Sequence, residues 1–161
     1  MPIDHSNLLQ ALWRAAHVTR ARIGAVAEEG GVTFQQYMVL SVLGDANDEG
    51  LPTLEIASRM VERAPAITGL VDRLERQGMV RRQRIDSDRR QIRCALTEQG
   101  RELMGRLDHG MAAATAQALG MLTGHEVGVL RHLLVRMGRE NAQLVNNLLD
   151  GHDGRDGQES H

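Results

Sequence analysis

Apolar residues recur at intervals of three and four through most of the chain, which predicts a protein built mainly from helices. A first helix is expected over about residues 6–29, ended by Gly30 and Gly31. A second is expected after Thr33, because Thr33 and Gln36 have the spacing of a capping box. The apolar positions of these two helices are Leu8, Leu9, Leu12, Trp13, Ala16, Ile23, Val26, Tyr37, Val39, Leu40, Val42 and Leu43.

A loop rich in Gly, Asn and Asp over residues 45–52 precedes two shorter helices. Thr53 is the expected N-cap of the first, and Pro65 suits the first turn of the second. Gly78 is expected to end that second helix. One face of it should be buried, because its apolar residues recur at helical spacing. They are Ile67, Leu70, Val71 and Leu74.

After Gly78 the pattern alternates, as it does in strands. Residues 79–85 and 91–96 have the length of strands. Ile92, Cys94 and Leu96 alternate with Arg93 and Ala95, which predicts a half-buried strand. Residues 86–90 form an expected charged turn, Asp-Ser-Asp-Arg-Arg, between the two strands. We therefore predict a β-hairpin.

Two more helices are expected, over about residues 98–119 after Thr97 and from the capping box Thr123–Glu126 to about residue 149. Residues 150–161 are expected to be disordered. Apolar residues of the last helix follow a heptad spacing interrupted by Asn141, which favours a dimer seam over packing within the chain. The predicted dimer interface comprises Leu9, Leu12, Val127, Leu130, Leu134, Met137 and Leu144.

Composition narrows the class of protein. The chain has 161 residues, suited to one domain, and only 2% of them are aromatic, so an aliphatic core is expected. No apolar run is long enough for a membrane span, and the first residues do not resemble a secretory signal. Cys94 is the single cysteine, which excludes an intramolecular disulfide. We expect a cytoplasmic protein without a membrane partner.

The charge is unevenly distributed. All 19 basic residues are Arg, and the formal net charge is −2. The segment from Arg59 to Arg93, however, contains ten Arg and five acidic residues, which gives it a local net charge of +5. This basic segment indicates an anionic partner, although a solvated charged surface would give the same count.

Helix, turn, helix and basic hairpin together form the pattern of a winged helix-turn-helix. The helix after Pro65 has an apolar face for the domain and a face of small residues and Arg that suits the major groove of DNA. An Arg at the hairpin suits the narrow minor groove. The residues expected to contact double-stranded DNA are Thr53, Arg63, Ala64, Ala66, Thr68, Gly69, Arg73, Arg76, Arg82, Arg84, Asp88, Arg89 and Arg90.

These segments resemble the MarR family of transcriptional regulators. Residues 33–40 resemble its LTxxQYxVL stretch, and Ile56, Ala57 and Met60 resemble its LAxxL helix. Residues 68–78, TGLVDRLERQG, resemble the TxLVDRLExxG recognition helix almost position by position. Residues 88–101 resemble DRR…LTxxGR. The resemblance covers about residues 8–149, and its motifs are most specific over residues 65–101.

The resemblance implies a mainly α fold with a small β-hairpin wing, in a single domain over residues 1–149. A winged helix-turn-helix lobe would span about residues 33–97, and dimerisation helices would span about residues 6–29 and 98–149. It further implies a homodimer that represses at a pseudo-palindromic operator. In such regulators a wing Arg enters the minor groove and a wing Asp holds it. Those roles carry over to Arg90 and Asp88, with Arg89 as the other candidate.

The family's small aromatic or phenolic effectors suggest a pocket around Trp13, His17, Arg20 and Tyr37, although these residues could equally pack the core. Cys94 is a candidate oxidant sensor, but a buried Cys is usually inert. The seven His are scattered, so no metal or other cofactor is expected.

Enzyme motifs such as a Gly-rich phosphate loop, His-Glu-x-x-His or Gly-x-Ser-x-Gly are missing from the sequence, and we expect no catalytic activity. The alternative function is a winged helix that binds a protein partner instead of DNA.

Overall fold

The computed structural model describes residues 5–46, 48–85 and 88–153. Within these ranges it describes all side chains except those of residues 5–6, 85, 88–90 and 139–153. The chain folds mainly into helices with a small sheet, as the sequence predicts. The elements in chain order are α1 (His5–Glu29), α2 (Phe34–Gly44), β1 (Leu51–Pro52), α3 (Thr53–Met60), α4 (Ala64–Arg76), β2 (Val80–Ile85), β3 (Asp88–Leu96), α5 (Glu98–Leu119) and α6 (Gly124–Asp153).

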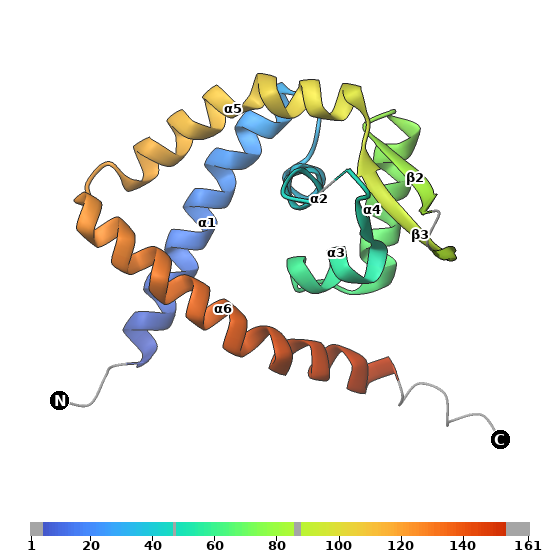
Figure 1. The fold of residues 1–161 in the computed structure, drawn as a ribbon. Coiled ribbons are helices and arrows are strands. Elements are labelled where there is room, and N and C mark those ends of the chain that lie inside the picture. The colour runs from blue at the N-terminus through green and yellow to red at the C-terminus, as the bar shows by residue number, and fades with distance from the viewer. Residues whose placement is uncertain (1–4, 47, 86–87, 154–161) are drawn as a thin grey trace.

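Figure 1 shows a lobe formed by α2, α3, α4 and the β2–β3 hairpin, beside the long helices α1 and α5. Helix α6 turns back from the far end of α5 and extends away from that junction (Figure 1). The DNA-contact residues proposed from the sequence thus belong to the compact lobe. The proposed dimer residues belong to the long helices.

Local capping sets several of the helix ends as expected. The Thr33 hydroxyl accepts a hydrogen bond from the Gln36 backbone, and the Gln36 side chain accepts one from the Thr33 backbone. Thr97 accepts a bond from Gly100 N in the same way. The reciprocal bonds between Thr123 and Glu126 stabilise the carboxylate and lower the pKa of Glu126. Local sequence alone was sufficient for these ends.

The predicted cap at Thr53 is wrong. Thr53 is the first residue of α3, and the N-cap is Pro52, which forms no side-chain capping bond. Leu51 and Pro52 pair with β3, so the chain enters the helix directly from an extended strand. The Thr53 hydroxyl instead lies 3.8 Å from Cys94 Sγ.

The hairpin belongs to a three-stranded antiparallel sheet with the order β1-β3-β2. The sequence did not predict β1, which has two residues and contains a proline. The expected turn over residues 86–90 is also shorter than predicted, because β3 begins at Asp88. Asp88 pairs with Ile85 across a register shift between Arg84 and Ile85. The wing strands therefore extend further than their alternation suggested.

The predicted alternation in β3 holds only in part. Cys94 and Leu96 are buried, but Ile92 is 50% exposed and Ala95 is buried as well. Cys94 packs within the core cluster, which does not include Ile92, and β1 pairs with β3 at Arg93 and Cys94. Ala95 is covered by the segment around Gly50, whereas Ile92 lies beyond the end of β1.

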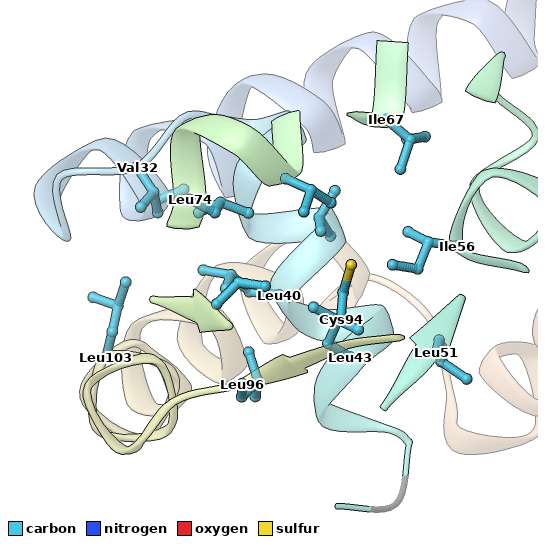
Figure 2. Close-up of a cluster of buried hydrophobic side chains, with 14 of the residues drawn as sticks. Val32, Leu40, Leu43, Leu51, Ile56, Ile67, Leu74, Cys94, Leu96 and Leu103 are labelled. Carbon is cyan, nitrogen blue, oxygen red and sulfur yellow. The ribbon is translucent and has the colours of Figure 1, made fainter. Parts of the chain in front are cut away.

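The hydrophobic core lies where α2, α3 and α4 meet the sheet (Figure 2). Ile67, Val71 and Leu74 of α4 are fully buried, as predicted, and Leu70 is partly buried. Leu40 and Ile56 meet them from α2 and α3, and Leu103 extends the core into α5. Burying each such side chain stabilises the fold by roughly 1.5–3 kcal/mol, so α4 is held firmly by its apolar face.

Helix α6 ends at Asp153, later than the expected residue 149, so residues 150–153 of the predicted disordered tail are helical. A single interior Gly such as Gly151 costs a helix only about 1 kcal/mol, which lets the helix continue. Residues 154–161 of that tail lie outside the described part of the chain. No described residue of α6 belongs to the buried core cluster.

Candidate nucleic-acid interface

Helix α4 presents an open face of small residues opposite its buried face. Ala66 and Thr68 are exposed, and Ala64 and Gly69 are partly exposed. The Thr68 hydroxyl donates to Ala64 O, which keeps it close to its own helix. A Cβ at Gly69 would have only the Arg73 guanidinium nearby, at 4.0 Å. This surface can approach a flat partner such as the edges of base pairs very closely.

Three arginines flank that face. Arg63 is the N-cap residue of α4, and Arg73 and Arg76 lie in its last turns. Arg73 and Arg76 are exposed, and Arg76 Nε donates to Asp72 O at 3.3 Å. Long cationic side chains beside a small-residue surface suit phosphates or base edges.

The wing residues Arg81, Arg82, Gln83 and Arg84 follow one another on β2, but they do different things. Arg81 donates to Leu96 O at 2.8 Å and so ties β2 to the end of β3. Gln83 donates to the backbone oxygens of Asp48 and Glu49. Arg84 is exposed. The structure thus leaves Arg84 available to a partner and assigns its neighbours to internal contacts.

Arg82 forms two ion pairs within the chain, which the sequence did not predict. Its Nη2 lies 2.5 Å from Asp72 Oδ1, and its Nη1 contacts Glu75 Oε2. The hydrogen bond to Asp72, more than any other interaction, raises the pKa of Arg82. Both carboxylates belong to α4, so they could not be recognised as partners before the wing was placed beside that helix.

The wing base makes a further contact that sequence reasoning missed. Arg93, counted only as part of the basic segment, donates through Nη1 to Gly50 O at 3.2 Å and lies 3.7 Å from Glu49 Oε2. The only signal was the acidic loop over residues 45–52, which could not be paired with β3 without the tertiary fold.

Asp88, Arg89 and Arg90 have their backbone in β3. Their side chains lie outside the described residues, so their expected roles at the wing stay predictions. Thr53 is partly buried, and its hydroxyl lies 3.8 Å from Cys94 Sγ. Its expected contact with DNA stays a prediction.

The four residues expected at an effector pocket fall into separate contacts. Trp13 stacks on His17, with ring centroids 5.2 Å apart, and Trp13 is 66% exposed. Arg20 instead lies over the Phe34 ring, 5.3 Å from its centroid. Tyr37 packs on the core, and burial raises the pKa of its hydroxyl, with a smaller effect from Asp108.

A cavity of about 280 Å³ lies at the junction of α2, β3 and α5, and none of these four residues lines it. Apolar and charged residues both line it, namely Leu43, Gly44, Ala46, Asp48, Ala95, Leu96, Arg101, Met104, Gly105 and Asp108.

Other candidate chemistries find little support. Cys94 is fully buried, and burial raises the pKa of its thiol, so it is a poor nucleophile. Over residues 5–46, 48–85 and 88–153, no group of three potential ligands could hold a metal ion. No helix among those residues is long and apolar enough to cross a membrane.

Comparison with known proteins decides the family. A family model described as MarR family matches residues 30–91, which run from the start of the lobe to the wing. The transcriptional repressor MdtR of Bacillus subtilis is 33% identical over 110 residues, covering 68% of this chain and 70% of that protein. The chain belongs to the MarR family of transcriptional regulators.

Two further comparisons agree with this assignment. The transcriptional regulator TtmR of Methylorubrum extorquens is 36% identical over 129 residues, and the chain spans 63% of the length of that relative. The crystal structure of CouR from Rhodococcus jostii, bound to p-coumaroyl-CoA, superimposes with a TM-score of 0.74 at 28% identity, covering 81% of this chain and 90% of CouR. These MarR relatives are regulators of transcription rather than enzymes.

Proposed function

We propose that the protein is a dimeric repressor that binds a pseudo-palindromic operator and leaves it when a small aromatic or phenolic ligand binds. The observation that carries the proposal is the open face of α4, where small residues lie beside Arg73 and Arg76 next to a basic wing. A single domain over residues 1–149, acting in the cytoplasm where the DNA is, belongs to the same proposal.

Binding would use both grooves of DNA. The small face of α4 fits the major groove, where close approach allows contact with thymine methyls or reading of DNA shape. Arg73 and Arg76 would reach bases or phosphates from its later turns. Arg84 and the wing residues Asp88, Arg89 and Arg90 would serve the neighbouring minor groove.

Dimerisation is supported by apolar side chains that the monomer leaves in solvent. On α1 these include Leu9 and Trp13, and on α6 they include Leu133, Leu134 and Met137. Val127 and Leu130 of the proposed seam are half-buried, and the side chain of Leu144 lies outside the described ones. An exposed apolar surface over two long helices favours association with a second copy.

Ligand response is supported by the solved relative CouR, which binds a coumaroyl thioester. In this chain the proposed ligand residues remain Trp13, His17, Arg20 and Tyr37. Trp13 and His17 stack on each other, and Arg20 lies over the Phe34 ring. Trp13 is too exposed to serve the core of the monomer, so a stacking role in the dimer is available to it.

The test of operator binding is fluorescence anisotropy with the DNA immediately upstream of the protein's own gene. A scrambled duplex of the same length is the control, and both are titrated at two salt concentrations. We expect tight binding that prefers the native duplex and weakens steeply with salt, because neutralised phosphates release counterions. Equal weak binding to both duplexes would contradict the proposal and favour a protein-binding winged helix.

Two matched experiments test the remaining claims. Sedimentation equilibrium of Leu134→Glu should show dissociation of the dimer, whereas His132→Glu, at an exposed polar position two residues away, should not. In the anisotropy assay p-coumaroyl-CoA should release the operator, and Trp13→Ala should reduce that response. A monomeric wild-type protein, or release that does not depend on Trp13, would contradict the corresponding claim.

A further inference from the structure

Arg82 occupies an unusual place for a basic wing residue. Its strand position is opposite Cys94, and Cys94 is fully buried in the core. Directly opposite residues in antiparallel strands project to the same face, so Arg82 starts from the core face of the wing. From there its guanidinium reaches α4 and contacts two carboxylates at once, those of Asp72 and Glu75.

The backbone joins the same cluster. Arg82 N donates to Glu75 Oε1 at 3.3 Å, while the Arg82 side chain contacts the other oxygen of that carboxylate. Glu75 therefore holds both the main chain and the side chain of one wing residue. The Arg82 side chain is 27% exposed, whereas the side chains of Asp72 and Glu75 are 50% and 38% exposed, so these charge-assisted bonds lie at the edge of the core.

We infer that Arg82 is a positioning residue, which fixes wing strand β2 against recognition helix α4 through Asp72 and Glu75 and does not itself contact DNA. The inference rests on the proposed function. A protein that contacts adjacent major and minor grooves of DNA needs a fixed distance between its recognition helix and its wing. The bridge from Arg82 to Asp72 and Glu75 joins these two elements directly. It also neutralises acidic groups on α4 that would otherwise repel phosphates.

Arg84 provides a matched control. It lies two residues further along β2, so it projects to the same face as Arg82. It pairs with Ile92, which is half-exposed, and is itself exposed. Arg82→Met and Arg84→Met therefore remove the same charge from the same strand, once inside the bridge and once outside it.

The experiment measures operator affinity over a series of salt concentrations, together with the ratio of affinities for operator and scrambled duplex. Arg82→Met should weaken operator binding roughly 10-fold, as expected for a coupled charge network, with an unchanged salt slope. Arg84→Met should reduce the slope by about 0.9, the value for one lost phosphate contact. A reduced slope for Arg82→Met would overturn the inference.

A second set of variants tests the bridge itself. The double variant Asp72→Asn/Glu75→Gln should lose operator preference as Arg82→Met does, and adding Arg82→Met to it should cost little more. Fully additive losses would overturn the inference. If circular dichroism shows that the Arg82→Met variant does not fold, the Arg82→Lys variant is used in its place. Lys keeps the charge but lacks the planar fork, so operator preference should still fall, whereas a phosphate contact would be largely retained.

The two hypotheses fail in different ways. If the wild-type protein does not prefer its operator, the proposed function fails, and the positioning role, which rests on it, fails with it. If the wild type binds its operator and Arg82→Met binds it equally well, the proposed function stands and the positioning role is refuted.

Discussion

Substitution of Gly50 tests how closely the segment before β1 packs against β3. Gly50 has a φ of +70°, in the left-handed region, and precedes β1. A Cβ at this position would lie 2.1 Å from Cys94 O and 2.9 Å from Ala95 Cβ. Gly50→Ala therefore combines backbone strain with a clash against β3, and one of the two strands must move.

The expected loss follows from these two terms. Left-handed geometry costs a non-glycine residue about 1–2 kcal/mol, and forced movement of packed groups costs about 1–3 kcal/mol more. Gly50→Ala should thus lower the free energy of unfolding by about 2–5 kcal/mol. Gly31→Ala is the matched control, because Gly31 has a φ of +81° but nothing within 4 Å of its Cβ position. It should lose only the strain, about 1–2 kcal/mol.

Urea unfolding followed by circular dichroism, at one fixed protein concentration, measures both losses. Both variants introduce the same kind of backbone strain. The difference between their losses in unfolding free energy therefore reports the close approach of Gly50 to β3. If Gly50→Ala loses no more stability than Gly31→Ala, the reasoning about the packing of β1 on the wing is refuted.

Three other predictions concern the proposed interface and the buried thiol. Because burial raises the pKa of the Cys94 thiol, less thiolate is present at a given pH. A disulfide reagent at pH 8 should therefore label the native protein far more slowly than the urea-unfolded protein. Equal labelling rates would contradict the burial of Cys94. Arg73→Ala should weaken operator binding by about 1–3 kcal/mol if Arg73 binds a base, with relaxed preference at one operator position. Equal weakening on every duplex would make it a phosphate contact. Arg90→Ala should lower affinity most for operators with a narrow A·T-rich minor groove, and unchanged affinity in the anisotropy assay would remove Arg90 from the wing assignment.

Sequence patterns predicted the features that depend on neighbours along the chain. The capping bonds of Thr33, Thr97 and Thr123 join residues three positions apart, so their sequence spacing is already their geometry. The same holds for the left-handed Gly78 after α4. The motif order within residues 65–101 was sufficient for the family as well.

Contacts between distant segments needed the tertiary structure. The sequence placed Arg20 on one helix face with Trp13, but Phe34 of another helix lies under its guanidinium. It placed Ile92 on the buried face of β3 with Cys94, but Ile92 is 50% exposed and lies outside the core cluster. A periodic pattern states which side of an element faces away from water, and says nothing of how far the neighbouring element extends.

The basic segment shows the division most clearly. Its charge indicated an anionic partner or a solvated surface, and the order of helix, turn, helix and hairpin indicated a winged helix-turn-helix. Charge counts treat every Arg alike, however, and only the packed structure separates Arg82, held by Asp72 and Glu75, from the exposed Arg73 and Arg84. The physical reason is that an ion pair depends on the distance between its groups, and folding alone brings residues 72, 75 and 82 together.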